Sequence, residues 1–125
     1  MNPIEFQFEI LKGYEPGALL QRLVDGSHLV SVPNVGIPLG WSKGSTEVKF
    51  IAPIGYPMAR PDCFWTDYDL RLNNGNMPQN TALNQIPNVS SNHLWFSWHL
   101  STWNPNVDNL LTYLNVIRRR LHDPR

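Results

Sequence analysis

Several features that would assign a protein to a particular class are scarce in this sequence or missing from it. Its 125 residues include a single cysteine, Cys63, so no internal disulfide can form. Ten lysines and arginines balance ten aspartates and glutamates, and a neutral chain lacks the field that attracts nucleic acid or an anionic membrane. No apolar run is long enough to cross a membrane, and no signal-peptide pattern is present. We therefore expect a cytoplasmic protein that binds neither nucleic acid nor membrane.

Motifs for metals and cofactors are also missing. The four histidines and Cys63 show none of the usual spacings of zinc ligands. No glycine-rich loop of the kind that holds a phosphate occurs. We predict no metal site and no cofactor, so any activation by a nucleotide would have to come from another protein.

The chain is instead rich in turn-forming and aromatic residues. Its length predicts one domain that spans residues 1–125. Eleven prolines and eight glycines predict many turns. Five tryptophans are more than a small core needs, so they can serve core packing, a surface for a partner, or both.

A turn pair in the first part of the chain predicts a β-hairpin. Asp25 and Gly26 separate two apolar segments, residues 19–24 and 29–35, and glycine accepts the positive φ that tight hairpin turns require. A short helix over residues 16–24 is the competing interpretation.

A second group of strands follows around three prolines. Residues 47–52 predict a strand whose alternate apolar side chains share one face. Proline cannot donate to a strand ladder, so Pro53, Pro57 and Pro61 take the chain out of the sheet until it returns at residues 62–66. With the hairpin, these segments predict about four antiparallel strands in a meander.

The last part of the chain predicts a long loop and then an amphipathic helix. Residues 73–92 are rich in Asn, Pro, Gly and Ser, and a loop of this length in a compact domain is often functional. Asn104 and Pro105 predict the helix start, because asparagine is a good cap and proline suits the first helical position. The basic run 118–120 predicts a solvated helix end. Apolar residues recur at helical spacing, namely Val107, Leu110, Leu111, Leu114, Ile117 and Leu121.

Two motifs resemble the ubiquitin-conjugating (UBC) fold. One is Tyr-Pro-x-x-x-Pro at residues 56–61, and the other is Trp103-x-Pro at the mouth of the predicted helix. In that family the catalytic cysteine lies eight residues before the tryptophan, a position that Trp95 occupies here. The resemblance, which covers residues 18–122, implies an α+β fold of the UBC type without its usual nucleophile.

Further residues are similar to prokaryotic family E of the conjugating superfamily. Pro-Asp-x-Phe-Trp at residues 61–65, Trp-His at 98–99 and Trp-x-Pro-x-Val-Asp-x-Leu-Leu from Trp103 carry this resemblance. Cys63 also sits as in the catalytically inactive UBC variants called UEV domains, in which this cysteine is a strand residue. The resemblance implies a bacterial ubiquitin-like pathway, with a ubiquitin-like protein, a ThiF-type activating enzyme and a JAB-type peptidase as partners.

Pattern and resemblance disagree at the N-terminal segment. Residues 3–12 alternate apolar and polar side chains, which is the period of a half-buried strand. The family, by contrast, usually opens with a helix. We leave the structure of this segment open.

Cys63 is the first candidate catalytic residue, because only a thiolate forms the thioester that a conjugating enzyme passes on. Its neighbours Phe64 and Trp65 are apolar and predict a buried thiol. The adjacent Asp62 would raise the pKa of the thiol further. Burial as a small apolar residue is therefore the alternative to catalysis.

His99 is the second candidate catalytic residue. It can act as a base or as a transient nucleophile near neutral pH, with Asp67 or Asp69 as an orienting acid in space. A hydrogen-bonded structural histidine is the alternative. A hydrolase set of Ser97, His99 and Asp108 can also be assembled, but no nucleophile-elbow motif surrounds it.

A partner-binding surface is predicted around the position of the missing cysteine. If residues 93–99 are extended, alternate side chains that include His93, Trp95 and His99 share one face. The residues that we predict to contact a partner are Trp95, His93, Tyr56 and Trp98.

Three functions remain open at this point. The leading hypothesis is a non-canonical UBC-fold protein that binds the ubiquitin-like protein, its activating enzyme, or both. The second is an active conjugating enzyme that uses Cys63 or His99. The third is a tryptophan-rich binding module for sugars or peptides that is unrelated to conjugation.

Overall fold

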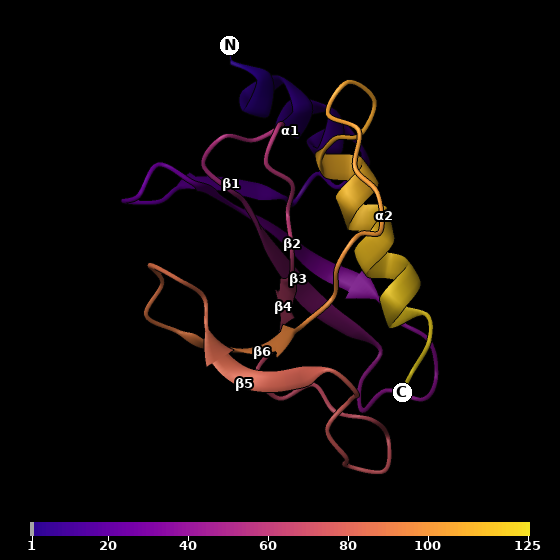
Figure 1. Cartoon of the computed structure of the whole chain (residues 1–125). Coiled ribbons are helices and arrows are strands. Elements are labelled where there is room, and N and C mark those ends of the chain that lie inside the picture. The colour runs from indigo at the N-terminus through magenta and orange to yellow at the C-terminus, as the bar shows by residue number, and fades with distance from the viewer. Residues whose placement is uncertain (1) are drawn as a thin grey trace.

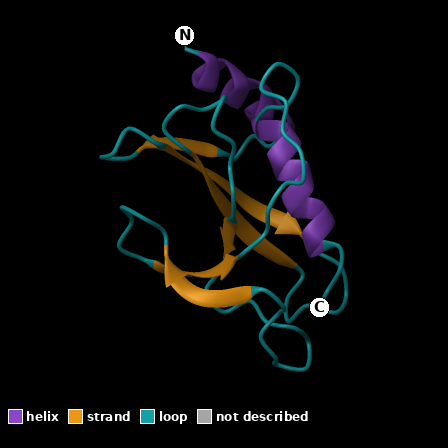
Figure 2. Cartoon of the chain, in the orientation of Figure 1, coloured by secondary structure: helices purple, strands orange, loops and turns teal. Residues whose placement is uncertain are grey.

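The computed structural model describes residues 2–125, which form a sheet layer and a helix layer (Figures 1 and 2). The sheet is antiparallel and has six strands in the order β1-β2-β3-β4-β6-β5. This confirms an α+β fold with an antiparallel sheet, whereas the expectation of about four strands is wrong. The elements in chain order are α1 Pro3–Tyr14, β1 Leu19–Arg22, β2 His28–Gly36, β3 Ser45–Ala52, β4 Phe64–Thr66, β5 Thr81–Gln85, β6 Asn92–Phe96 and α2 Leu110–Leu121.

The chain opens with a helix. The side chain of Asn2 accepts a hydrogen bond from the Glu5 N–H, and Pro3 occupies the first helical position. The sequence alternates like a strand because two of its apolar residues, Phe6 and Ile10, are exposed on the helix. A different set of apolar residues forms the helical stripe that faces the core. That stripe consists of Ile4, Phe8 and Leu11. The helix that the family resemblance implies is therefore present in residues 3–12.

The predicted hairpin forms between β1 and β2. Gly26 has a φ of 91°, and the carboxylate of Asp25 accepts hydrogen bonds from the N–H and the hydroxyl of Ser27. These interactions close the turn, so the alternative of a helix over residues 16–24 is wrong.

β5 lies inside the segment that was expected to be one long loop. Residues 73–92 contain this strand, which forms the edge of the sheet and pairs only with β6. Leu83 is exposed, and so are Asn84 and Gln85. An edge strand with so little burial has no apolar alternation, which explains why its sequence reads as a loop.

α2 begins five residues later than the sequence predicts. Asn109, not Asn104, caps the helix in a capping box with Thr112. Asn104 instead closes a separate turn, in which its N–H donates to the carboxylate of Asp108. Val107 lies in that turn and is exposed, so it is not part of the apolar stripe of the helix.

The main core fills the space between the helices and one face of the sheet. β3 contributes three fully buried side chains, Val48, Phe50 and Ala52, as its alternation predicts. A smaller cluster covers the opposite face, which we call the outer face of the sheet. Its buried members are Leu23, Leu29, Trp65 and Ile86. Across residues 2–125, no helix combines the length and the apolar character that a membrane crossing requires.

Candidate functional site

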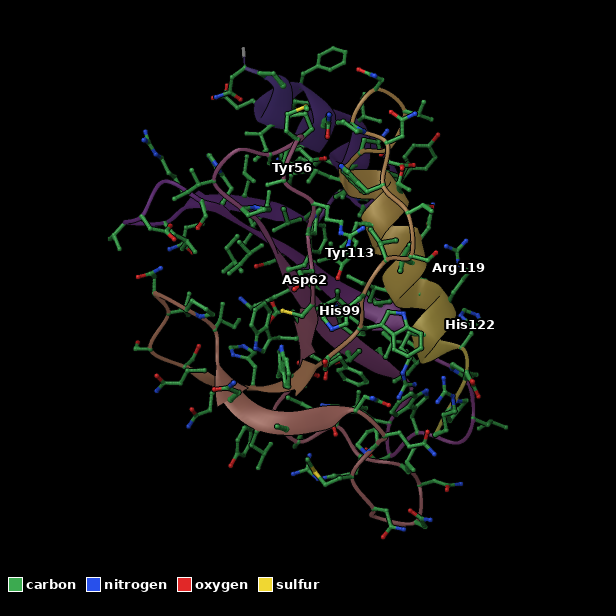
Figure 3. The ribbon with its side chains drawn as sticks, viewed as in Figure 1. Tyr56, Asp62, His99, Tyr113, Arg119 and His122 are labelled. Atoms are coloured by element: carbon green, nitrogen blue, oxygen red, sulfur yellow. The ribbon has the colours of Figure 1, made fainter. Side chains whose placement is uncertain are left out.

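The side chains of His99 and Asp62 are in direct polar contact. Nδ1 of His99 lies 2.7 Å from Oδ1 of Asp62, and Nε2 lies 3.5 Å from Oγ of Ser97. Figure 3 shows Asp62 and His99 beside each other, to the left of α2 in this view. Asp62 follows the Pro61 turn just before β4, and His99 lies just beyond the end of β6, so pairing of β4 with β6 joins them.

The acids expected to orient His99 lie elsewhere. Asp67 and Asp69 bind the ammonium of Lys43 at 2.8 and 2.6 Å. Asp108 accepts a hydrogen bond from the N–H of Asn104 instead of contacting His99. Sequence reasoning considered Asp62 only as a neighbour of Cys63. The strand register could have revealed its role, because Phe64 pairs with Phe96 and the same register continued by two residues brings Asp62 to the segment of His99.

The contact with Asp62 gives His99 a defined tautomer. A carboxylate can only accept a hydrogen bond, so in the neutral imidazole the proton resides on Nδ1 and the lone pair is on Nε2. The side chains of His99 and Asp62 are 59% and 64% exposed. An exposed pair of this kind contributes little stability, but it leaves Nε2 accessible to a reacting group.

Cys63 is poorly suited to form a thioester. Burial raises the pKa of its thiol above the ordinary value, and the charge of Asp62 acts in the same direction. A hydrogen bond from the side chain of Trp95 opposes the shift but does not reverse it. Cys63 packs against the outer-face cluster. Because its pKa is raised, the thiol stays protonated near neutral pH, and a protonated thiol is a weak nucleophile.

Trp95 and His93 lie on the outer face of the sheet. Both are half-buried members of β6, while the intervening Leu94 is fully buried against the main core. This alternation agrees with the expected extended conformation for residues 93–96, whereas β6 ends at Phe96 and residues 97–99 lie beyond the strand. Trp95 is paired in register with Trp65 of β4 and packs against the outer-face cluster, so its ring is only partly available to a partner.

Tyr56 and Trp98 lie on the other face of the sheet. Both are half-buried against the main core. The hydroxyl of Tyr56 donates to the side chain of Gln7, and its ring lies 6.0 Å from that of Trp103. The four residues predicted as one partner surface are thus divided between two faces, and the structure does not bring them together.

The motif residues around Pro57 hold the turn before β4. The indole N–H of Trp103 donates to the carbonyl of Pro57 at 2.8 Å, so the two motifs that resemble the UBC fold contact each other. Pro61 is buried, and Pro105 lies in the turn before α2. Among residues 2–125, no group of three or more His, Cys, Asp or Glu side chains could hold a metal ion.

An antiparallel sheet with two helices on one face, together with a Tyr-Pro turn that a later tryptophan holds, is consistent with the E2-like class of proteins. The chain belongs to prokaryotic E2 family E, whose family model matches residues 15–123. No curated protein and no solved structure matches it. Membership indicates a role in a conjugation pathway and, in general, interaction with ubiquitin-like proteins or activating enzymes. An unrelated tryptophan-rich module is not supported by this membership.

Proposed function

We propose that the protein serves a bacterial ubiquitin-like pathway as a non-canonical E2-fold member that needs no cysteine. Its role is to bind the ubiquitin-like protein, a ThiF-type activating enzyme, or both, and a JAB-type peptidase is a further candidate partner. The observation that carries this proposal is the state of Cys63, the one thiol of the chain, whose burial raises its pKa. A second support is Trp95, which stands where the resemblance places the family cysteine.

The contact surface that we propose is the part of the outer face around Trp95 and His93. A half-exposed indole leaves apolar area in water, and burial of that area against a partner would stabilise a complex. Tryptophan is also enriched among the residues whose truncation weakens protein interfaces most. Tyr56 and Trp98 lie on the helix side, so they would serve a second contact if they bind a partner at all.

Calorimetric titration of Trp95→Ala with the cognate ubiquitin-like protein and activating enzyme tests this surface. We expect binding to weaken by roughly 1 to 4 kcal/mol, as for other interface tryptophans. Because Trp95 also packs against Trp65, thermal unfolding must show that the variant is folded. His93→Glu places a charge on the same face and should also weaken binding. Leu39→Ala, which truncates a fully exposed apolar side chain in a loop, is the matched control.

Unchanged affinity in both folded variants would show that the outer face is not the contact surface. If Trp95→Ala chiefly unfolds the domain and His93→Glu binds normally, Trp95 belongs to the core and the proposed placement is wrong.

Transfer through His99 is the second candidate function, and the contact with Asp62 favours it. Nε2 would attack the carbonyl of a thioester held by the activating enzyme, so that a C–N bond forms, the C–S bond breaks and the thiolate leaves on that enzyme. The product is an acyl-imidazolium, whose positive charge the carboxylate of Asp62 can stabilise. An amine of the target would then form the new C–N bond, release Nε2 and lose its proton.

A reaction with activating enzyme, ATP and ubiquitin-like protein separates the two functions. Transfer through His99 predicts an adduct that still forms in Cys63→Ala and is lost in His99→Gln and Asp62→Asn, while the binding affinity is unchanged. A binding role without transfer predicts no adduct in any variant. A thiol-sensitive adduct that disappears in Cys63→Ala would instead restore Cys63 as the nucleophile and contradict the leading proposal.

A further inference from the structure

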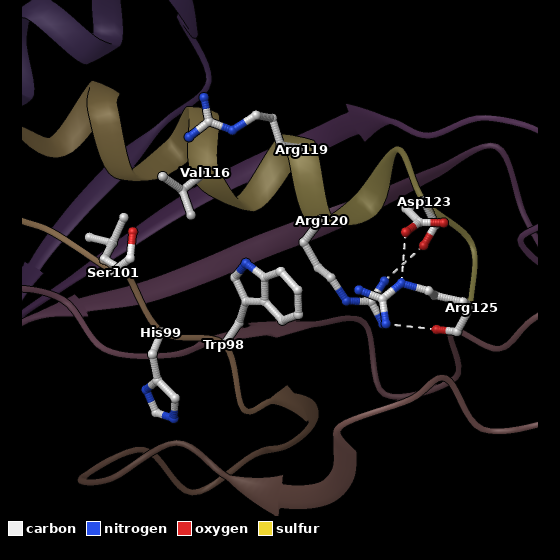
Figure 4. A pocket seen from close by; sticks show the side chains of 9 residues that line it. Trp98, His99, Ser101, Val116, Arg119, Arg120, Asp123 and Arg125 are labelled. Atoms are coloured by element: carbon white, nitrogen blue, oxygen red, sulfur yellow. Dashed lines mark hydrogen bonds and ion pairs between the residues drawn. The ribbon is translucent and has the colours of Figure 1, made fainter.

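A pocket of about 230 Å³ opens between the last turns of α2 and the segment that follows β6 (Figure 4). Three arginines line it, Arg119, Arg120 and Arg125, and Asp123 is the one acidic side chain in the lining. We call this site the arginine pocket. Its side chains carry an excess of positive charge, because Asp123 can offset only one of the three cations.

Arg120 is the fixed element of the pocket. Its side chain is 2% exposed, and its guanidinium lies 5.2 Å from the ring centre of Phe96 and 5.4 Å from that of Trp98. Its hydrogen bonds go to main-chain oxygens of Gln79, Asp123 and Arg125, and its buried Nε has no hydrogen-bond partner among residues 2–125. Burial lowers its pKa, which reflects the cost of holding this charge away from water.

The basic run at the end of α2 is therefore not simply a solvated helix end. Arg118 pairs with Glu15 just beyond α1, and Arg120 is buried in the pocket wall. Arg119 is exposed, and its side chain makes no hydrogen bond or ion pair within residues 2–125. Within the described residues, Arg119 is thus an unpaired cation at the edge of the pocket, and Arg120 is a buried cation in its wall.

Trp98 forms a flat wall that holds two guanidinium groups. Arg125 lies 5.6 Å from the ring centre of Trp98, and its Nε donates to the carboxylate of Asp123 at 2.7 Å. Nη1 of Arg125 also donates to the side-chain oxygen of Gln79 at 2.9 Å, so Nη2 is the donor group of this guanidinium that remains without a partner among residues 2–125. Leu100 and Val116 add apolar surface beside these donors.

We propose that the arginine pocket binds a carboxylate presented by a protein partner, on an acidic side chain or at a chain end. The fork of donors in a guanidinium matches the two oxygens of a carboxylate. The apolar walls suit the alkyl stem that carries such a group, whereas a free phosphate has no such stem. The volume is below the range of roughly 300 to 1,000 Å³ that is typical of drug-sized ligands, so one side chain is an appropriate occupant.

The position of His99 connects this pocket with the candidate site. His99 is one of the residues that line the pocket, although its imidazole points away from the arginines toward Asp62 (Figure 4). A carboxylate docked beside Trp98 would therefore hold a partner segment close to the chain segment that carries His99. Carboxylate binding does not depend on transfer at His99. It is therefore measured on the isolated chain, without activating enzyme or ATP.

The test is an NMR titration of the ¹⁵N-labelled chain that follows the indole N–H of Trp98. The probes are acetyl-Ala-Glu-Ala-amide, its neutral partner acetyl-Ala-Gln-Ala-amide, acetyl-Ala-Gln-Ala with a free chain end, and inorganic phosphate. We expect the indole signal to shift with one or both carboxylate peptides and not with the neutral amide. The two carboxylate arms show whether a side chain or a chain end is preferred.

Arg119→Gln combined with Arg125→Gln should weaken binding of the carboxylate peptide by about tenfold, the loss of one charge-assisted hydrogen bond. Arg22→Gln removes an exposed arginine from β1 and should leave binding unchanged. Arg120 is not varied, because its burial makes unfolding the expected result. Equal responses to the Glu and Gln peptides, unchanged binding in the double variant, or tighter binding of phosphate than of either carboxylate would overturn the proposal.

Discussion

Leu114 is the side chain whose truncation should test the fold most directly. It lies in the middle of α2, is fully buried and packs in the main core between the helix and the sheet. Leu114→Ala removes three carbon atoms without changing the helical backbone, since alanine is the strongest helix former. The effect on stability therefore reports packing alone.

The magnitude follows from the burial of Leu114. Three carbons at about 0.8 kcal/mol each give a transfer loss of about 2.4 kcal/mol. The cavity left behind adds to this loss, so we expect about 3 kcal/mol within the usual range of about 2 to 5. A domain of this length has a stability of about 6 to 19 kcal/mol, so the variant should remain folded in water. Ile117→Ala, also fully buried, should behave similarly.

Urea unfolding followed by tryptophan fluorescence measures this loss as a lower midpoint at unchanged slope. Asn115→Ala is the matched control, because Asn115 is the next residue of α2 and is exposed. We expect the control to lie within about 0.5 kcal/mol of the parent protein. A Leu114→Ala midpoint that matches the control would mean that α2 packs with a different face and that the core assignment is wrong.

Two further predictions concern the helix start and the thiol. Asn109→Ala should cost about 1 kcal/mol in the same unfolding assay by removing the observed cap, and no loss would contradict the helix start at residue 110. Cys63 should react with a disulfide reagent more slowly in the native protein than in the unfolded chain at pH 8, and equal rates would contradict its burial. Since the pKa of the folded thiol is raised, its contribution to stability is present below the pKa of the unfolded thiol, near 9, and is lost as the pH rises through the folded pKa.

Local patterns predicted the parts of the fold that local chemistry determines. The hairpin follows from Asp25 and Gly26, and β3 follows from alternation that matches one buried face. α1 was ambiguous, because Ile4 and Phe8 belong both to a period of two and to a helical stripe. Only the core that covers this stripe decides between the two.

The start of α2 shows a different limit. Two asparagines, Asn104 and Asn109, each precede residues that can form a helix, and Pro105 makes the first signal stronger. The second prevails because Asn109 and Thr112 exchange hydrogen bonds in a full capping box, while Asp108 ties Asn104 into its own turn. A possible capping residue, considered by itself, does not reveal which of two neighbouring asparagines will start the helix.

The candidate site depends on a strand order that the sequence does not reveal. In a simple meander β5 would lie between β4 and β6 and would separate Asp62 from His99. Instead β6 pairs with β4, and β5 is displaced to the edge. Because β4 and β6 are antiparallel, the end of β6 meets the start of β4, so His99 reaches Asp62 and not Asp67, which follows the other end of β4. The position of β6 between β4 and β5 also brings the segment after β6 close to α2, where Trp98 contacts Arg120. Both the histidine site and the arginine pocket thus follow from the position of one strand, and this is why neither could be derived from residue spacing alone.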